Sequence, residues 1–540
     1  MSATTEPRPA TTPADPGDRG GRHAFLVATG IFASRMAGLV RQRVFAHYFG
    51  LSAAADVFSA AFRIPNFLQN VFGEGVLSAS FIPAYARLIA RDDEEEAGRL
   101  AGAIAALLAL IVSVIVLLGV LGAPALTGIL AGGFEGEKRA LTVRLVRILF
   151  PGAGLLVLSA WCLGILNSHR RFLLSYMAPV IWNFAMIATL VVGGRKVGGS
   201  LDALAVWLAW GSVVGSALQF IVQLPSVLRL VPRLRFGLGI GSEHVGEVVR
   251  SFGPVFIGRG VSQISAFVDV VIASYLPTGA VTAISNAQTL YMLPISLFGM
   301  AVSAAELPAM SAVGGDEASV AAILRARVAA GLRRLAFFVI PSGVAFLAIG
   351  DVLATIVFRS GRFTADDARY VWAILAGSAV GLLAATSGRL YSSVLYARRD
   401  TRTPLRYAIV RVTLTIVLGY LFALHLPGWL GRSERWGASG LTASAGIAAW
   451  VEFALLRRAV QRRIGAVEVS RRNLVMLYLS AVVAGAVAWW EWRAVRVLPR
   501  FPSAVLTVAI YGAVYLGMTA LLRVPEASAF VNRVARRRAR

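Results

Sequence analysis

Residues 101–122 read AGAIAALLALIVSVIVLLGVLG, a stretch without one charged side chain. An α-helix of about 20 apolar residues crosses the hydrocarbon core of a bilayer. Apolar runs recur along the whole chain, and we expect spans near 24–49, 56–86, 101–122, 145–166, 172–193, 201–224, 252–276, 280–308, 334–357, 371–396, 405–427, 437–456, 473–492 and 502–522. The sequence therefore predicts an all-α integral membrane protein with about 14 transmembrane helices.

The composition excludes a water-soluble globule. Of the 540 residues, 57% are hydrophobic and only 15% are charged, with a mean hydropathy of +0.70, whereas soluble domains carry about 25% charged residues. The excess of 53 basic over 28 acidic residues is typical of cytoplasmic loops that face anionic lipid, so we expect membrane lipids and no nucleic acid as partners. A single cysteine, Cys162, and five scattered histidines predict neither a disulfide nor a metal site, and we expect no cofactor.

A weak internal repeat favours two lobes in parallel orientation. Residues 34–49 and the later Arg63-Ile64-Pro65 resemble residues 262–276 and 291–294, at an offset of about 228 residues. Six predicted helices separate the two copies, so both run in the same direction, as in transporters with a cavity between two lobes. We predict an N-lobe over 24–224 and a C-lobe over 252–457, joined by a cytoplasmic linker over 225–251. Two additional helices lie within 458–522 in this prediction. A disordered cytoplasmic tail over 1–23 precedes the lobes, and a basic cytoplasmic tail over 523–540 ends the chain. Lysine and arginine are most abundant in connections on the side of the termini, which predicts that both termini are cytoplasmic.

Ionisable residues inside apolar spans are the candidate functional residues, because each costs about 2.5–3.5 kcal/mol at the bilayer centre unless it meets water or a partner. The first two spans hold Arg35, Arg41, Arg43, Asp56, Arg63 and Glu74, and later spans hold Arg147, Arg259, Asp269, Glu306, Arg389, Arg411 and Glu452. The planar, permanently charged guanidinium group suits a phosphate. One interpretation is a hydrated cavity that presents arginines to an anion. The alternatives are that Arg41 and Arg43 reach outward to the interface and that the other charges form local ion pairs.

Prolines and glycines interrupt the first two spans of each lobe. Those in the first and second spans include Gly38, Pro65, Gly73 and Gly75, and Pro294 is the counterpart of Pro65 in the repeat. Kinked or unwound helices of this kind can bend during a transport cycle, and Gly38 would let another backbone approach. We predict these five residues to be structural hinges.

Motifs along nearly the whole chain carry a family resemblance. They are SRMAGLVR at 34–41, ADVF at 55–58, IPN at 64–66, FGEGVLSASFIP at 72–83, GILN at 164–167, RF at 171–172, AP at 178–179, Asn183, GP at 253–254, SQI at 262–264, GRFT at 361–364 and YARRDTRTP at 396–404. Together they closely resemble the MurJ (MviN) family of lipid II flippases in the MOP exporter superfamily. The resemblance implies two pseudo-symmetric six-helix lobes and two C-terminal helices that edge a groove for a lipid tail.

The activity implied by the resemblance is transport in the bacterial cytoplasmic (inner) membrane. Family members move the undecaprenyl-diphosphate-linked peptidoglycan precursor, lipid II, to the periplasmic leaflet by alternating access, with ions or the membrane potential implicated and the cell-wall synthesis machinery as a possible neighbour. The family's cavity residues carry over to Arg35, Arg41, Asp56, Glu74 and Arg389. We therefore predict substrate binding by Arg35, Arg41, Arg63, Arg259 and Arg389, and charge partners or gates at Asp56, Glu74 and Asp269.

The chain departs from the family pattern at two places. Gln69-Asn70 stands where members commonly have an arginine, and Gln288-Thr289 stands where many have an acidic residue followed by arginine. Arg63 and Arg259 are candidates to replace the missing positive charge. The alternatives to a lipid II flippase are a flippase for another polyprenyl-linked oligosaccharide, an ion-coupled drug exporter of the same superfold, and a noncatalytic cell-wall scaffold. An enzyme is disfavoured because the acid-rich loops, 92–96 and 366–367, offer little for metal or base chemistry.

Overall fold

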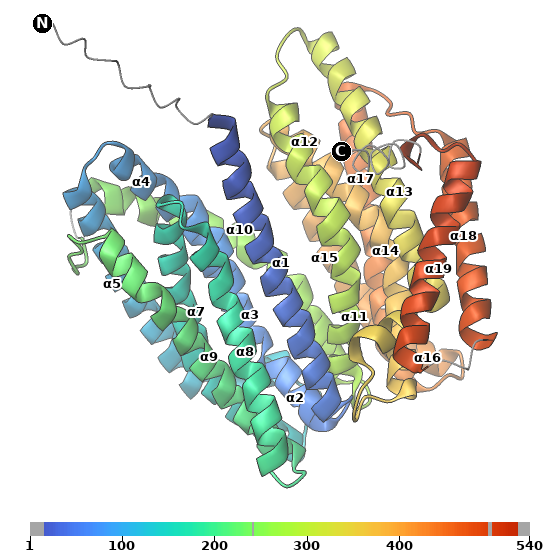
Figure 1. Ribbon diagram of the computed structural model, residues 1–540, viewed down its shortest axis with the longest axis horizontal. Helices are drawn as coiled ribbons and strands as arrows, with labels where there is room; N and C mark the ends of the chain where they lie inside the picture. Colours follow the sequence, from blue (N-terminus) through green and yellow to red (C-terminus); the bar gives the residue numbers. More distant parts are fainter. Residues whose placement is uncertain (1–15, 240–241, 495–498, 528–540) are drawn as a thin grey trace, which may run out of the picture.

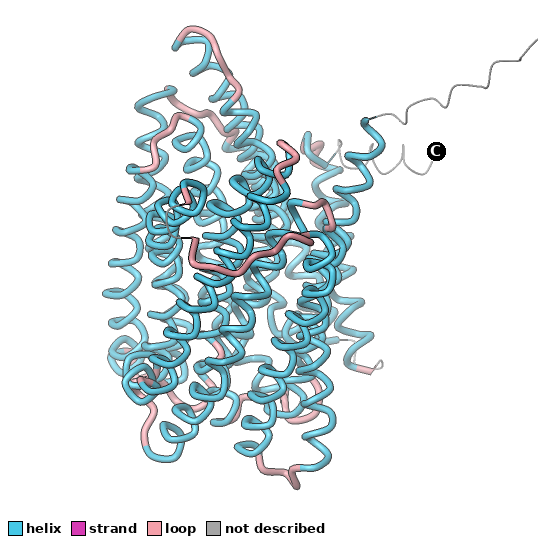
Figure 2. Tube along the Cα trace, turned by 90° about the vertical axis from the view of Figure 1, so that its left-hand side faces the viewer, coloured by secondary structure: helices cyan, strands magenta, loops and turns pink. Residues whose placement is uncertain are grey.

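The computed structural model describes the backbone of residues 16–239, 242–494 and 499–527, and the side chains of these residues except 16–28, 73–76 and 254–266. This part of the chain forms helices and no strand (Figure 2). The helices up to the long connection are α1 (Pro16–Phe49), α2 (Ala53–Ala61), α3 (Arg63–Leu68), η1 (Gln69–Leu77), α4 (Ser78–Ala90), α5 (Glu94–Leu121), α6 (Ala123–Leu130), α7 (Gly136–Ser168), α8 (Phe172–Lys196) and α9 (Leu201–Leu230). Those after it are α10 (Glu243–Ser274), α11 (Ala280–Pro294), η2 (Ile295–Met300), α12 (Ala301–Ser311), α13 (Glu317–Phe358), α14 (Ala365–Ala397), α15 (Arg402–Tyr420), η3 (Leu421–His425), α16 (Leu426–Trp429), η4 (Glu434–Trp436), α17 (Gly437–Ile464), α18 (Arg471–Ala494) and α19 (Arg500–Leu521).

Every predicted span falls, to within two residues, on one helix or on one run of joined helices. Among the described residues, 11 helices are long and apolar enough to cross a membrane. The three expected spans outside this set fall on α1, on the run from α2 to α4, and on α10. The run from α2 to α4 is interrupted at Phe62 and contains the π-helical turn η1. The all-helical membrane fold is confirmed, and the number of 14 crossings stays a prediction.

The helices form two groups that lean together at one end (Figure 1). One group holds α1 to α9 and the other holds α11 to α17, with α18 and α19 packed on each other and on α13. Helix α10 contacts both groups, since it packs on α4 and η1 and also on α15. We call the end at which α1 begins and α19 ends the terminal end, and the opposite end the distal end (Figure 1). The two groups converge at the distal end.

Four of the five predicted hinge residues lie in or beside wide turns in the second span of each group. Pro65 lies in α3 immediately before the π-helical turn η1, which contains Gly73 and Gly75. Pro294 ends α11 immediately before the π-helical turn η2. Proline removes a backbone donor, and π-turns widen a helix and often mark functional sites. That both groups have the same irregularity at the repeat offset is consistent with the predicted pseudo-symmetry, and bending at these turns stays a prediction.

The close backbone approach expected at Gly38 is absent in this conformation, and the role of Gly38 as a hinge stays a prediction. A Cβ atom added at Gly38 would meet no atom within 4 Å, so no other backbone approaches it. The close approaches of this kind occur elsewhere, for example where Gly446 packs on Gly381 between α14 and α17.

Three predicted segment boundaries differ from the observed helices. Helix α1 already begins at Pro16, so the predicted tail over 1–23 is helical from that residue, and proline suits a first helical turn. The predicted linker over 225–251 shortens to residues 231–242, because α9 runs on to Leu230 and Ser242 caps the start of α10 by accepting from Val245 N. Helix α17 continues to Ile464, beyond the predicted end of the C-lobe.

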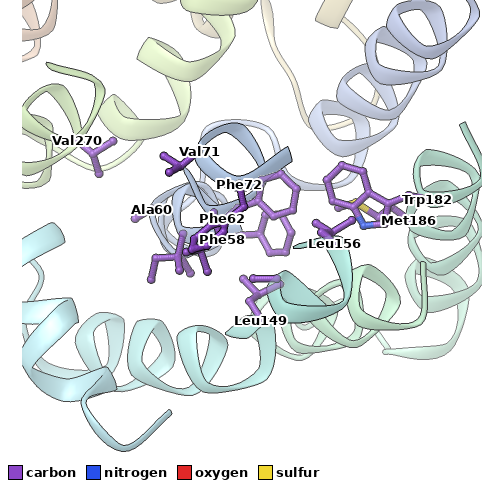
Figure 3. Packing of buried hydrophobic residues seen from close by; sticks show 14 of the residues in the cluster. Phe58, Ala60, Phe62, Val71, Phe72, Leu149, Leu156, Trp182, Met186 and Val270 are labelled. Atoms are coloured by element: carbon purple, nitrogen blue, oxygen red, sulfur yellow. The ribbon is translucent and has the colours of Figure 1, made fainter. Parts of the chain in front are cut away.

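An aromatic cluster holds α2 and α3 against α8 (Figure 3). The rings of Phe58 and Phe62 stack with centroids 5.2 Å apart, and the Phe62 ring lies nearly parallel to that of Trp182, 5.6 Å away. The Trp182 indole donates to Ser212 O on α9 at 3.1 Å, which fixes the orientation of its ring. Stacked aromatic pairs contribute about 0.5–1.5 kcal/mol beyond their burial. This rigid cluster forms one wall of the cavity described next.

Candidate functional site

A cavity of about 170 Å³ lies where the two helix groups meet. Its lining comes from α1, α2, α3, α8, α9 and α11, and consists of Arg41, Gln42, Phe45, Phe58, Ser59, Phe62, Arg63, Asn66, Met186, Leu190, Leu208, Ser285 and Thr289. Among the described lining residues there are two arginines and no carboxylate. The volume admits several waters but is below the range of about 300–1,000 Å³ that is usual for ligand pockets. In this conformation the cavity can hold a small charged group and its water, not a large headgroup.

Arg41 is held by aromatic rings instead of by an acid. Its guanidinium carbon lies 5.3 Å from the centre of the Phe62 ring and 5.4 Å from that of the Trp182 ring, and Nη1 donates to the Met186 sulfur at 3.7 Å. Cation–π contacts are worth about 2 kcal/mol when the cation is desolvated. These contacts position the positive charge at the cavity without neutralising it. The alternative that Arg41 reaches out to the membrane interface is wrong in this conformation.

Asp56 closes the distal end and does not pair with the cavity arginines. Its carboxylate is 1% exposed and accepts from Gly279 N at 2.7 Å, from Thr282 N and Oγ1 at 3.0 Å each, and from Lys138 Nζ at 3.2 Å. Gly279 gives α11 no capping side chain of its own, so Asp56 caps that helix from the other helix group. The prediction that Asp56 is a charge partner of the cavity arginines finds no counterpart in this conformation, because its partners are a lysine and a helix end.

Further polar contacts near Asp56 join the two helix groups. Ser59 lies 3.3 Å from Thr282 Oγ1, and Gln42 donates to Asn286 at 2.7 Å. At the distal loops, Arg362 N donates to His47 O at 2.9 Å. Together with the Asp56 contacts, they define a distal closure that separates the cavity from the distal end.

The other predicted binding arginines lie outside the cavity lining. Arg35 is exposed on α1, and it donates to Ser296 Oγ in η2 at 2.7 Å, which ties the two helix groups together nearer the terminal end. Arg389 is exposed on α14, within electrostatic range of Arg411 and Glu452. The side chains of Arg259 and Glu74 lie outside the described residues.

Several of the remaining charges form the local pairs that were the open alternative. Arg411 pairs with Glu452 at 3.2 Å, and Glu306 pairs with Arg327 at 3.2 Å and with Arg334 at 3.5 Å. Arg43 donates to Val357 O at 3.4 Å and its guanidinium carbon lies 5.4 Å from the centre of the Phe501 ring, so it joins α1 to α13 and α19. These arginines bind carboxylates or a backbone carbonyl, whereas Arg41 contacts only aromatic rings and a sulfur atom.

The family model described as "Lipid II flippase MurJ" matches residues 45–501 of the chain. The chain belongs to the MurJ family. Its relatives include the lipid II flippase MurJ of Burkholderia cenocepacia, with 30% identity over 514 residues that cover 92% of this chain and 96% of the relative. They also include the probable lipid II flippase MurJ of Vibrio cholerae, with 30% identity over 481 residues that cover 87% and 88%.

Solved structures support the same fold. A lipid II flippase MurJ in an inward closed conformation matches with a TM-score of 0.76 at 23% identity, over 92% of this chain and 98% of that one. An inward-facing multidrug resistance transporter of the MATE family, from the MOP superfamily, matches with a TM-score of 0.61 at 16% identity, over 79% and 95%. The chain is thus a multi-pass membrane protein with the MurJ and MATE transporter fold.

The departure from the MurJ pattern at Gln288 has a structural counterpart. Arg63 Nη2 donates to Gln288 Oε1 at 2.8 Å, and Gln288 Nε2 donates to Asp269 Oδ2 at 3.2 Å. This chain of hydrogen bonds links α3 to α11 and α10 through a neutral amide. Gln288 stands between Arg63 and the Asp269 carboxylate, so Arg63 lines the cavity beside Arg41 without a direct ion pair.

Replacing Gln288 with leucine should lower the stability of the protein by about 1–3 kcal/mol, because Asp269 would lose this donor while its Oδ1 already lacks a partner. Thermal unfolding in detergent measures the effect. Thr289→Val, one residue further on the same helix, is the matched control, since its hydroxyl bonds only to Ser285 O within α11. Equal melting temperatures for Gln288→Leu and the wild type would contradict the bridging role.

Sequence reasoning missed two residues of this site. Lys138 is one of only two lysines in the chain, but its pairing with Asp56, at 3.2 Å, brings together residues from distant helices. Trp182 lies one residue before Asn183, which the family motifs include. Neither residue carries a local signal that points to Asp56 or Arg41.

Proposed function

We propose that this chain flips lipid II from the cytoplasmic to the periplasmic leaflet of the bacterial inner membrane by alternating access. The observation that carries the proposal is the pair of guanidinium groups, Arg41 and Arg63, that line one cavity between the helix groups with no carboxylate among the described lining residues. Membership of the MurJ family supports the same substrate. The protein acts as a transporter and not as an enzyme in this proposal.

The chemistry of the substrate explains why the cavity needs arginines. An unassisted diphosphate would have to leave water for hydrocarbon, at a cost of tens of kcal/mol on Born-type estimates. Arginine donates paired hydrogen bonds to phosphate oxygens and stays protonated at any working pH. A diphosphate offers acceptors to both Arg41 and Arg63, so the helix groups need to separate only far enough to admit the sugars and peptide.

The distal closure gives the cycle its direction in this proposal. We place the terminal end in the cytoplasm, which leaves the cavity closed toward the periplasm by Asp56 and the neighbouring contacts. Rocking of one helix group against the other would break these contacts and expose the arginines to the periplasmic leaflet. The family resemblance adds an ion or the membrane potential as the driving force, and the cell-wall synthesis machinery as a neighbour.

An apolar groove offers a path for the polyprenyl tail. It has a volume of about 400 Å³ and is lined by residues of α11, η2, α13 and α19, among them Phe298, Phe338 and Tyr511. The Phe298 and Phe338 rings stack with their centroids 4.4 Å apart. A tail in this groove stays in contact with apolar side chains while the headgroup occupies the central cavity.

Reconstituted vesicles that contain the protein should translocate fluorescent lipid II, and unlabelled lipid II should compete. A flippase for another polyprenyl-linked oligosaccharide would instead be inhibited by that oligosaccharide lipid and not by lipid II, and a drug exporter would ignore both. A scaffold would translocate none of them, and in a complementation test it would tolerate neutralising all the cavity arginines. Empty vesicles are the control, and a rate equal to theirs would contradict the proposal.

A further inference from the structure

A second polar cleft lies at the distal end, away from the central cavity. It has a volume of about 880 Å³ and opens between α13, α14, α18 and α19 (Figure 1 shows these helices at the edge of the bundle). None of its lining residues belongs to the central cavity. The cleft is therefore a separate candidate site, independent of the proposed transport of lipid II.

Arginines dominate the cleft. Arg369, Arg493 and Arg500 line it. Arg359 follows the end of α13. Burial and the nearby positive charges of Arg500 and Arg369 lower the pKa of Arg359. In the described part of the chain, the carboxylates that line the cleft or pair with its arginines are Asp351 and Asp366.

The arginines therefore outnumber the acids at this cleft. Asp366 pairs with Arg369 at 3.1 Å in an exposed position, where an ion pair contributes little. The three lining arginines against the two carboxylates leave an excess of positive charge. An anion bound among them would relieve their mutual repulsion.

Tryptophans place the cleft at a membrane interface. Trp372, Trp489 and Trp492 line it together with the arginines. The Arg493 guanidinium carbon lies 3.9 Å from the centre of the Trp489 ring, and the Trp372 indole donates to Leu347 O at 3.0 Å. Tryptophan is enriched where the hydrocarbon meets the headgroups. The phosphates of membrane lipids lie at the same depth.

A buried hydroxyl adds an unused polar group. Ser503, in the first turns of α19, lines the cleft and is 2% exposed, and its Oγ has no hydrogen-bond partner. Buried polar groups are almost always paired, so an orphaned hydroxyl beside an arginine-lined cleft points to a ligand acceptor. Phosphate oxygens would accept from this hydroxyl and from the guanidinium groups together.

We infer that this cleft binds the phosphate of an anionic lipid in the leaflet at the distal end. Two lipids share this chemistry: an anionic phospholipid of the bilayer, and a polyprenyl diphosphate that has reached this leaflet. Either one would fasten α18 and α19 to α13 and α14 through a headgroup that all four helices contact.

Native mass spectrometry of the purified full-length protein tests the inference. The protein is mixed separately with phosphatidylglycerol, with undecaprenyl diphosphate and with zwitterionic phosphatidylethanolamine. The wild type should retain at least one of the two anionic lipids more tightly than phosphatidylethanolamine. The double variant Arg369→Gln/Arg500→Gln should weaken that retention by about tenfold or more, because each lost guanidinium removes charge-assisted hydrogen bonds.

The control variant is Arg139→Gln/Arg432→Gln, which removes the same charge from exposed positions at the distal end outside the cleft. Retention of phosphatidylglycerol identifies a structural phospholipid, and retention of undecaprenyl diphosphate alone identifies the diphosphate lipid. Equal binding of all three lipids, or an equal loss in the cleft and control variants, would overturn the inference. Arg493→Gln provides a second test if the double variant has a lowered melting temperature.

Discussion

Replacing Arg41 with alanine will reduce lipid II translocation by about a hundredfold or more, because the variant loses a bidentate, charge-assisted contact to the diphosphate. Arg41 is the residue on which the cavity depends most. Its guanidinium group is held between Phe62 and Trp182 and pairs with no described carboxylate, so its charge remains available to a ligand. The measurement is the initial rate of flipping in vesicles that contain equal amounts of folded protein.

Two further variants separate charge from shape at this position. Arg41→Lys keeps the positive charge but loses the planar fork, so we expect an intermediate rate. Arg41→Gln keeps much of the stem that packs on the rings and should be as inactive as Arg41→Ala. A normal rate for Arg41→Gln would exclude Arg41 from binding the diphosphate.

The matched control is Arg43→Ala, two residues along the same helix. Arg43 contacts Val357 O and the Phe501 ring and does not line the cavity. Its loss should lower the melting temperature and leave the flipping rate per folded molecule within about twofold of the wild type, as expected for a residue with structural partners only. A loss of transport as large as that of Arg41→Ala would show that the assay reports damage to α1 and not binding.

The sequence could predict this fold and part of this site for definite physical reasons. Hydropathy decides which segments cross a membrane, so every predicted span falls on helices. The cost of an unpaired charge in a span singled out Arg41 and Arg63, and both line the cavity. The same cost argument also selected Arg35. In the structure Arg35 does not line the cavity but donates to the Ser296 hydroxyl.

What the sequence could not predict are pairings between residues that are distant along the chain. A cost argument identifies a charge that needs a partner but does not say which partner it finds. Asp56 meets Lys138 because α2 packs on α7. Asp56 meets the start of α11, and Gln288 connects Arg63 to Asp269, because the two helix groups converge. The close approach expected at Gly38 is absent for a related reason: a small residue permits a close approach but does not require one.

Replacing Asp56 with alanine should destabilise the protein by about 3–5 kcal/mol, the range for a buried charge that loses its partner. The substitution leaves Lys138 without its acid and removes the acceptor for Gly279 N and Thr282 N at the start of α11. Since the contacts with Gly279 and Thr282 join the two helix groups, their loss falls on the distal closure. We expect a lower melting temperature and a distal end that opens more often.

Cysteine labelling measures the opening. The chain has one cysteine, the buried Cys162, so Ser285→Cys in a Cys162→Ser background gives one reporter at the cavity lining. A membrane-impermeant maleimide added on the distal side should label this reporter slowly in the otherwise unchanged protein and about tenfold faster or more with Asp56→Ala. Asp202→Ala, which removes an exposed acid from the first turn of α9, is the control and should change neither property.

A double-mutant cycle tests whether Asp56 acts through Lys138 or through the end of α11. If the ion pair dominates, Lys138→Ala alone should destabilise about as much as Asp56→Ala, and the double variant should add little. If capping dominates, Lys138→Ala should have the smaller effect, because Gly279 and Thr282 would still have their acceptor. In either case a labelling rate that stays slow in Asp56→Ala would mean that other contacts, such as Gln42 with Asn286, hold the distal end shut. A transporter needs a closure that is strong enough to hold yet can be reversed. Three neutral donors from Gly279 and Thr282 on the single carboxylate of Asp56 meet that need, since opening exposes all three to water at once.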